Sequence, residues 1–283
     1  MRPERTTVSQ EQIIELEEKA REIRGRILDL GACGKKIHYG GSLSMVEILT
    51  VLYFQTLRHD PRRPSWEDRD RFLLSKGHSC PGLYVVLAEA GYFPREILAT
   101  FRELDTILQG HPDRKKTPGV EITSGSLGQG LSQGVGIALG ARMDSKSYRV
   151  YVLIGDGEMD EGQIWEAMLA AAHYNLDNLT VIVDRNRIQS AGFTEDIIRL
   201  EPLADKWKAL GWAVVEADGH SIHSLLDAFA AVQRIQGQPS VIIANTIKGK
   251  GVSFMENKIA FHTTAINPEQ YRDAICQIKR EGN

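Results

Sequence analysis

The sequence contains little cysteine and no long apolar run. Its three cysteines, Cys33, Cys80 and Cys276, lie far apart and lack the spacing of a structural metal site. Free thiols in a reducing cytoplasm are therefore the simplest interpretation. No apolar run approaches the length of a membrane span, and the first residues lack the apolar core of a signal peptide. We therefore expect a cytoplasmic protein without a membrane segment.

The sequence also lacks an excess of either charge. Its 34 basic and 37 acidic residues leave a net charge of −3, which argues against a nucleic-acid partner held by bulk electrostatics. The 42% hydrophobic and 25% charged residues are typical of a globular protein. Because no internal repeat, low-complexity linker or domain boundary is evident, we expect a single domain over residues 1–283.

Short apolar runs alternate with helix-like segments along the chain. This alternation predicts a three-layer α/β fold, in which helices flank a doubly wound and mostly parallel sheet. A long amphipathic helix is predicted from Ser9 to Leu30, where Ser9 and Gln12 form a potential capping box. Five runs predict strands, and two of them, Val150–Ile154 and Leu179–Val183, have the apolar character of buried parallel strands. The other three are Arg71–Ser75, Ala213–Glu216 and Ser240–Ala244.

Further helices are expected between and around these strands. Ser44, with Glu47 three positions later, predicts a capped helix that runs to Leu57. The helix predicted over residues 127–143 is rich in glycine, which weakens a helix by about 1 kcal/mol per residue, so we expect close backbone packing to require it. Other helices are expected over residues 81–90, 94–104, 201–210, 221–235 and 267–280, and loops over residues 31–44, 60–70, 110–125, 188–195 and 248–264.

One unit near the middle of the chain has residues suited to a metal and a diphosphate. A Gly-Asp-Gly motif containing Asp156 follows one strand, and an Asp-Arg-Asn motif ending at Asn186 follows the next. Because the carboxyl ends of parallel strands meet at one sheet edge, these two side chains should lie together. Their oxygens suit Mg²⁺ that carries phosphates. A simple turn with a capping asparagine is the alternative for such a short motif.

This paired arrangement resembles the signature of thiamine-diphosphate enzymes. The resemblance assigns Mg²⁺, or Ca²⁺ or Mn²⁺ in its place, to Asp156, Asn186 and the main-chain oxygen of Ile188. It places Gly157 against the diphosphate. The glycine run at residues 128–140 is not a dinucleotide fingerprint, because its spacing is wrong and it precedes a strand.

Four histidines lie in predicted loops, namely His38, His78, His111 and His262. Any one of them alone is most simply a solvated or structural residue, but loops also carry function. Four longer motifs accompany them in a fixed order: LSKGHSCPGLY, GHPDRKKTPGVEITSGSLGQGLSQGVG, GDGEMDEGQIWEA and KGKGVSFMENKIAFH. From about Ile23 to Asn267 the chain thereby resembles transketolase, which implies the diphosphate-binding (PP-type) thiamine-diphosphate fold.

The resemblance implies a role for each histidine and for several neighbours. The sugar and its hydroxyls would face His38, His111 and His262, which would assist proton transfers, since an imidazole pKa lies near the operating pH. Glu161 would join an acidic network across a subunit interface, or simply favour a helix N-terminus. Lys248 would neutralise phosphate charge, or be an ordinary surface lysine. Thiamine diphosphate would contact His78, Gly125, Ser126, Leu127, Gly157, Glu161, Asn186, Lys248 and His262.

Three positions depart from the family pattern. Tyr39 stands where a proline usually follows the histidine, Ala191 where an aspartate is common, and Thr263 where a glycine is common. The last two affect the expected shape of the substrate side more than cofactor binding.

The resemblance covers only the first part of a complete transketolase. We find no counterpart of the domain that clamps the aminopyrimidine ring or of its activating glutamate. We therefore expect an N-terminal subunit that joins a separate C-terminal chain, as α2β2, and transfers a two-carbon ketol unit between sugar phosphates. The alternatives are a deoxyxylulose-phosphate synthase-like protein, the α subunit of a 2-oxo acid dehydrogenase, a transketolase for a sulfonated or branched sugar, or a non-catalytic module.

Overall fold

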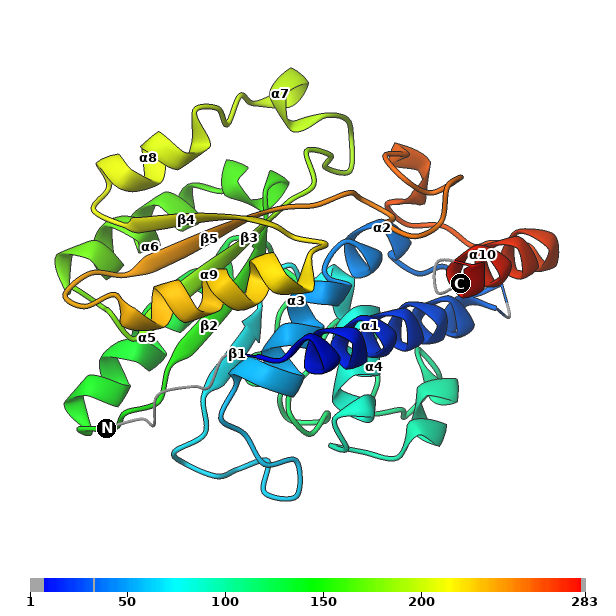
Figure 1. The fold of residues 1–283 in the computed structure, drawn as a ribbon, viewed down its shortest axis with the longest axis horizontal. Coiled ribbons are helices and arrows are strands. Elements are labelled where there is room, and N and C mark those ends of the chain that lie inside the picture. Colours follow the sequence, from blue (N-terminus) through cyan, green and yellow to red (C-terminus); the bar gives the residue numbers. More distant parts are fainter. Residues whose placement is uncertain (1–7, 33, 281–283) are drawn as a thin grey trace.

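A five-stranded parallel sheet forms the centre of the molecule, with the strand order β1-β2-β3-β5-β4 (Figure 1). The computed structural model describes residues 8–32 and 34–280. All five predicted strands are confirmed, because each begins at the predicted residue and ends within two residues of the predicted end. The strands are β1 (Arg71–Leu74), β2 (Val150–Gly155), β3 (Leu179–Arg185), β4 (Ala213–Asp218) and β5 (Ser240–Asn245).

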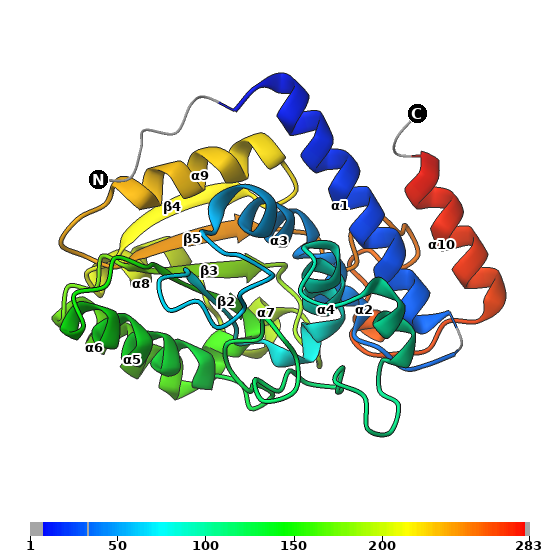
Figure 2. The same ribbon diagram turned by 90° about the horizontal axis from the view of Figure 1, so that it is seen from below.

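Helices cover both faces of the sheet, which confirms the predicted three-layer α/β fold (Figure 2). Strand β2 shows how the layers form: Tyr151 and Leu153 join one hydrophobic core, while Val152 and Ile154 join the other. This follows from the alternation of side chains along a strand. One face is covered by α1 (Gln10–Gly31), α3 (Val46–Val51), α4 (Cys80–Glu89) and α9 (Ile222–Arg234), the other by α5 (Gln129–Met143), α6 (Gly162–His173) and α8 (Leu203–Ala209).

Helix starts follow the sequence signals in one case and not in another. Helix α1 has the predicted capping box, in which the Ser9 hydroxyl accepts from the Gln12 amide and the Gln12 side chain accepts from the Ser9 amide. The predicted Ser44 cap is wrong, since α3 begins at Val46 without a side-chain cap. The Ser44 hydroxyl instead donates to the Asp184 carboxylate at 2.5 Å.

Short helical elements account for the other differences from prediction. Segments predicted as loops contain α2 (Tyr39–Leu43) and α7 (Thr194–Ile197), and the helix predicted to Leu57 ends as a π-helical turn over Leu52–Thr56. The helix predicted over residues 94–104 is only a 3₁₀ turn, Arg95–Thr100, because Phe101 has an extended ψ of 124° and Arg102 a φ of 62°, which no right-handed helix allows. The described residues end in α10 (Pro268–Arg280), beside α1 (Figure 2).

The glycines of α5 are explained by packing at some positions only. A Cβ at Gly130 would lie 2.8 Å from the Cα of Ser75, and one at Gly134 would lie 2.6 Å from Val152 Cγ2. Close packing is therefore confirmed at these two positions. At Gly136 and Gly140 an added Cβ would meet no described atom within 4 Å, so the packing explanation is wrong there.

Two remaining expectations concern thiols and membranes. Cys80 is buried and Cys276 exposed, and both are free thiols; Cys33 and residues 1–7 lie outside the described residues. Within residues 8–32 and 34–280, no helix combines the length and apolar character needed to cross a membrane.

Candidate active site

The carboxyl ends of the strands bring most of the predicted site residues to one edge of the sheet. In the parallel register Gly155 pairs with Asp184, and Asp184 pairs with Ala244. The turns that follow β2, β3 and β5 therefore start side by side. Ligands of open α/β sheets bind at this edge.

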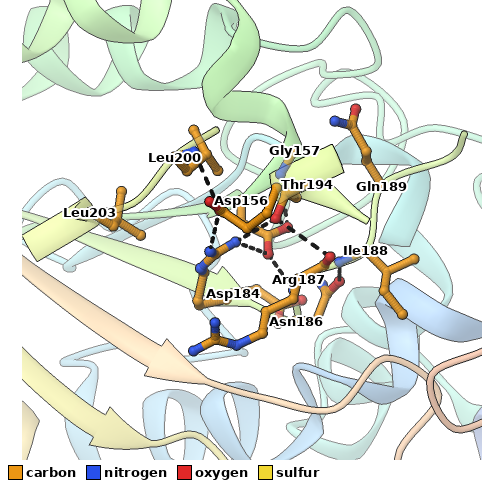
Figure 3. Close-up of polar contacts among 12 residues, drawn as sticks. Asp156, Gly157, Asp184, Asn186, Arg187, Ile188, Gln189, Thr194, Leu200 and Leu203 are labelled. Atoms are coloured by element: carbon orange, nitrogen blue, oxygen red, sulfur yellow. Dashed lines mark hydrogen bonds and ion pairs between the residues drawn. The ribbon is translucent and has the colours of Figure 1, made fainter. Parts of the chain in front are cut away.

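The three predicted metal ligands lie in two adjoining turns (Figure 3). Asp156 Oδ1 accepts from the Gly157 amide at 2.8 Å, and its Oδ2 accepts from the Arg187 amide. Asn186 Oδ1 accepts from the Ile188 amide at 3.1 Å. The described residues contain no cluster of three His, Cys, Asp or Glu side chains suited to a metal. The predicted set does not need one, because an amide and a main-chain carbonyl supply two of its three ligands.

The electrostatics of these turns fit an added cation. Asp156 is 1% exposed, and burial, followed by the nearby Asp184 carboxylate, raises its pKa above the ordinary value. Removing water from a carboxylate and placing a second one nearby both disfavour negative charge. A divalent cation on the hard oxygen ligands would offset that cost. The donor set and its charge therefore fit Mg²⁺.

Lys248 occupies the centre of the site. Its side chain is 3% exposed, so the alternative of an ordinary surface lysine is wrong. The ammonium donates to the Ile188 carbonyl at 2.6 Å and lies 3.1 Å from His262 Nδ1. Burial, more than any neighbouring charge, lowers the Lys248 pKa to about 8. The carbonyl predicted to bind the metal thus already contacts a cationic group.

Three of the four histidines form a compact triangle. The His38 ring centroid lies 5.2 Å from that of His78 and 5.5 Å from that of His262, and the last two are 5.2 Å apart. His111 is exposed and packs against the next predicted segment, since a Cβ at Gly125 would lie 3.2 Å from its Cδ2. Gly125 in turn packs against Gly77, the neighbour of His78, since a Cβ at Gly77 would lie 2.9 Å from the Gly125 nitrogen. The structure therefore brings all four predicted histidines to one region.

The triangle differs from expectation in its protonation. Burial, reinforced by neighbouring cationic groups, lowers the pKa of His38 and His262 to about 4 and that of His78 to about 2. The expectation of a pKa near the operating pH, made for the sugar-facing histidines, is therefore wrong for His38 and His262. A neutral imidazole offers one donor and one acceptor, which suits sugar hydroxyls.

The segments expected to approach the diphosphate, residues 125–127 and Gly157, are held by a residue that sequence reasoning missed. This residue is Glu158, which is 3% exposed. Its Oε1 accepts from the Gly128 amide at 2.9 Å and from the Ser75 hydroxyl at 2.5 Å. Its Oε2 accepts from the Gly155 amide at 3.1 Å. Gly128 has a φ of +80°, which favours glycine. A glutamate directly after Gly-Asp-Gly was the available signal. Between Gly125 and Gly128, Ser126 is exposed and Leu127 is half-buried.

A second missed residue is Arg185, which is 1% exposed. Its guanidinium donates to Asp156 Oδ2 at 3.2 Å and to the Thr194 hydroxyl at 2.7 Å. It also donates to Glu195 and Glu201, both at 2.9 Å. Arg185 thus fixes the loop after Asn186 to the predicted metal ligand. No local pattern identifies these partners.

The remaining predicted positions are more peripheral. Glu161 is exposed at the start of α6, against Gly128, and its role at an interface stays a prediction. Tyr39 is fully buried against Gly31, so this departure from the family pattern belongs to the core. Ala191 and Thr263 are exposed.

Residues 17–280 match the family model described as "Transketolase, thiamine diphosphate binding domain". The chain belongs to the transketolase family. It is 46% identical over 273 residues to "6-deoxy-6-sulfo-D-fructose transketolase subunit SqwG" of Clostridium sp. (strain MSTE9), covering 96% of this chain and 99% of that one. It is also 46% identical over 268 residues to an apulose-4-phosphate transketolase subunit of Actinobacillus succinogenes, covering 94% and 97%.

Solved transketolases share the fold. The structure superposes on "Transketolase from Leishmania mexicana" with a TM-score of 0.87 and 33% identity, covering 94% of this chain. It spans only 41% of that transketolase. The predicted likeness to the N-terminal part of transketolase, in the form of a subunit, is thereby confirmed.

Proposed function

We propose that this chain is the diphosphate-binding subunit of a two-chain transketolase. The reaction transfers a two-carbon ketol unit from a ketose phosphate to an aldose phosphate. The observation that carries the proposal is the adjacency of two groups at one sheet edge. One group is the turn of hard oxygen ligands at Asp156, Asn186 and Ile188, and the other is the histidine cluster. Lys248 contacts both, through the Ile188 carbonyl and His262 Nδ1.

The proposed cofactor contacts are those that the family resemblance implies, and the geometry described above is compatible with them. Asp156, Asn186 and the Ile188 carbonyl would hold Mg²⁺, or Ca²⁺ or Mn²⁺ in its place. The backbone at Gly157 and over residues 125–127 would approach the diphosphate, with His78 beside it, while the Lys248 ammonium would offset its charge. Thiamine diphosphate, when bound, supplies the electron sink of the reaction.

The histidines would act on the sugar. In its neutral form, His38 can accept the proton of a substrate hydroxyl at one ring nitrogen and donate from the other. His262 Nδ1 faces the Lys248 ammonium, so His262 would donate to a sugar oxygen from Nε2. His111, exposed beside Gly125, would contact the sugar from the outer side. Because the three lie on different segments, they can address different hydroxyls of one sugar.

A partner chain would complete the active site. It would clamp the aminopyrimidine ring and supply the activating glutamate, and two copies of each chain would assemble as α2β2 in the cytoplasm. Glu161, exposed at the start of α6, would lie at the interface. Residues 1–283 would then form a single diphosphate-binding domain.

The donor sugar is the open part of the proposal. Both relatives named above are transketolase subunits for unusual sugars, one sulfonated and one the phosphate of apulose. Their 46% identity over nearly the whole chain favours, as the second candidate for the donor, a sugar of this kind in place of an ordinary pentose phosphate.

The test is a ketol-transfer assay with Mg²⁺ and thiamine diphosphate. This chain alone, and the chain co-purified with the protein encoded beside it, would be given xylulose 5-phosphate with ribose 5-phosphate. Parallel reactions would offer 6-deoxy-6-sulfofructose or apulose 4-phosphate. We expect turnover by the pair only, and none in the pair that carries Asp156→Asn. A folded pair that neither binds the cofactor nor turns over any of these sugars would refute the proposal.

A further inference from the structure

Asp184 connects four segments that are far apart in the sequence. Its carboxylate is fully buried and accepts hydrogen bonds from the Lys76 ammonium, from the Ser44 hydroxyl at 2.5 Å and from the Thr246 hydroxyl. Lys76 also donates to the Gly41 carbonyl at 2.8 Å. These donors follow β1, α2 and β5, while Asp184 itself lies at the end of β3.

Each connected segment carries a residue of the proposed cofactor or sugar site. Lys76 lies two residues before His78, Asp184 two before Asn186, and Thr246 two before Lys248. Ser44 ends the short helix α2, which begins directly after His38. Asp184 itself is not among the proposed ligands, and its side chain has no exposed surface.

We propose that Asp184 is a positioning residue for cofactor binding, which holds the segments of His38, His78, Asn186 and Lys248 in register through Ser44, Lys76 and Thr246. This inference rests on the proposed function. An ionised carboxylate accepts several hydrogen bonds at once, so one side chain can fix several segments. If the connections are weakened, the binding-competent arrangement is less populated, and the apparent affinity falls by the same fraction.

Overall stability alone does not explain this arrangement. A buried ion pair such as Lys76–Asp184 contributes little net stability compared with apolar residues, because both charges lose their hydration. The carboxylate does, however, fix the direction of each of its donors. We therefore expect its loss to weaken cofactor binding more than its effect on unfolding explains.

A matched pair of buried hydroxyls provides the control. Thr180 and Ser240 are both buried and hydrogen-bond to each other at 2.9 Å. They lie at the amino ends of β3 and β5, whereas the site lies at the carboxyl ends. Thr246→Val and Ser44→Ala each remove one donor to Asp184, whereas Thr180→Val and Ser240→Ala each remove one buried hydroxyl bond far from the site. The experiment compares the melting temperatures of the four variants and their Kd for thiamine diphosphate with Mg²⁺, in the complex with the partner chain.

The two pairs of variants should separate on affinity and not on stability. A hydrogen bond to a charged group has a net worth that corresponds to a factor of about ten or more in an equilibrium constant. We expect Thr246→Val and Ser44→Ala to raise Kd by about this factor. The controls should lower the melting temperature similarly but leave Kd within about twofold. Equal Kd values for site variants and controls would overturn the inference.

A double variant separates charge balance from positioning. Asp184→Asn leaves the Lys76 ammonium buried without its counter-ion, so its instability alone would not be informative. Adding Lys76→Met removes that charge. We expect the double variant to regain melting temperature relative to the single variant but to keep a weak Kd. Recovery of both would reduce Asp184 to a structural role. Failure of the wild-type complex itself to bind the cofactor would instead reject the proposed function.

Discussion

Asp156 is the residue on which the proposed metal site depends most directly. Asp156→Asn keeps the shape of the side chain and one acceptor oxygen but removes the charge that burial and Asp184 already disfavour. Even partners in the outer shell of a metal contribute about 10- to 100-fold to its affinity, so a lost ligand should lower Mg²⁺-dependent cofactor affinity by at least about 100-fold. Calorimetric titration of the complex with thiamine diphosphate measures this.

The neighbouring Asp160 supplies the control for that prediction. It lies on the same turn, and its Oδ2 accepts from the Gln189 side chain at 2.9 Å, a bond that a carboxamide oxygen can also accept. Asp160→Asn should therefore leave the affinity within about twofold. Equal losses in the two variants would point to general charge in the loop and would contradict the ligand assignment.

His78 should make the stability of the isolated chain sensitive to acid. Its folded pKa is about 2, against 6.5 for the ordinary group. Above pH 6.5 both states are neutral, and as the pH falls below 6.5 only the unfolded state gains a proton, so stability falls. The free energy of unfolding falls by at most about 1.4 kcal/mol per pH unit. Between pH 6.5 and pH 5 this amounts to about 2 kcal/mol. Urea unfolding at both pH values measures the loss.

The variant His78→Asn should reduce this acid loss by about that amount. His223 on α9, whose side chain is 71% exposed, is the matched control, and His223→Asn should leave the acid loss unchanged. An identical pH dependence in wild type and His78→Asn would show that the buried imidazole is not the source.

The sequence identified those residues whose partners are local. Asp156 and Asn186 stand in short motifs directly after apolar strands, so their placement at one sheet edge followed from the pattern. Asp184 and Ser44, in contrast, meet across 140 residues of sequence, and no local signal links a serine to that carboxylate. The sequence-based prediction assigned Ser44 to a helix cap for this reason.

Strands were more predictable than helices. Four of the five strands are largely buried apolar runs, and such a run identifies a buried strand wherever its neighbours lie. The edge strand β4 is mostly half-buried or exposed. The short helices α2 and α7 contain five and four residues, too few for a periodic pattern. Tertiary contacts hold α2, since all five of its residues are buried. In α7 only Thr194 is buried, and its hydroxyl accepts from Arg185 at 2.7 Å.

Helix α5 provides a direct test of packing against propensity. Gly130→Ala would bring a Cβ within 2.8 Å of the Ser75 backbone and should destabilise the isolated chain by about 1–3 kcal/mol. Gly136→Ala meets no described atom within 4 Å and should stabilise it by about 1 kcal/mol, as expected for a helix interior. Chemical denaturation of both variants measures the difference, and a shared sign would contradict the packing described for Gly130.

On the scale of the whole molecule, the chain places binding groups from distant segments at one sheet edge. It spans, however, only about two-fifths of a complete transketolase, 41% of the Leishmania mexicana protein. Cofactor binding should therefore depend on the metal and be strengthened by the partner chain. A non-catalytic module that merely retains the fold would show neither property. These two dependences can be measured separately on the same protein.

Thermal unfolding with and without the metal tests both dependences. Thiamine diphosphate at 100 times its Kd stabilises the state that binds it by about 2.7 kcal/mol, which for a chain of this size corresponds to a rise of roughly 4–5 °C. We expect this rise for the complex with Mg²⁺, and a smaller one for the isolated chain at the same concentration of thiamine diphosphate. In EDTA we expect no rise for either, because Asp156 then lacks the cation that offsets its buried charge. Thiamine without its diphosphate is the control and should produce no rise. A rise that persists in EDTA would show that the diphosphate is held without the metal, and would contradict the assignment of Asp156, Asn186 and Ile188.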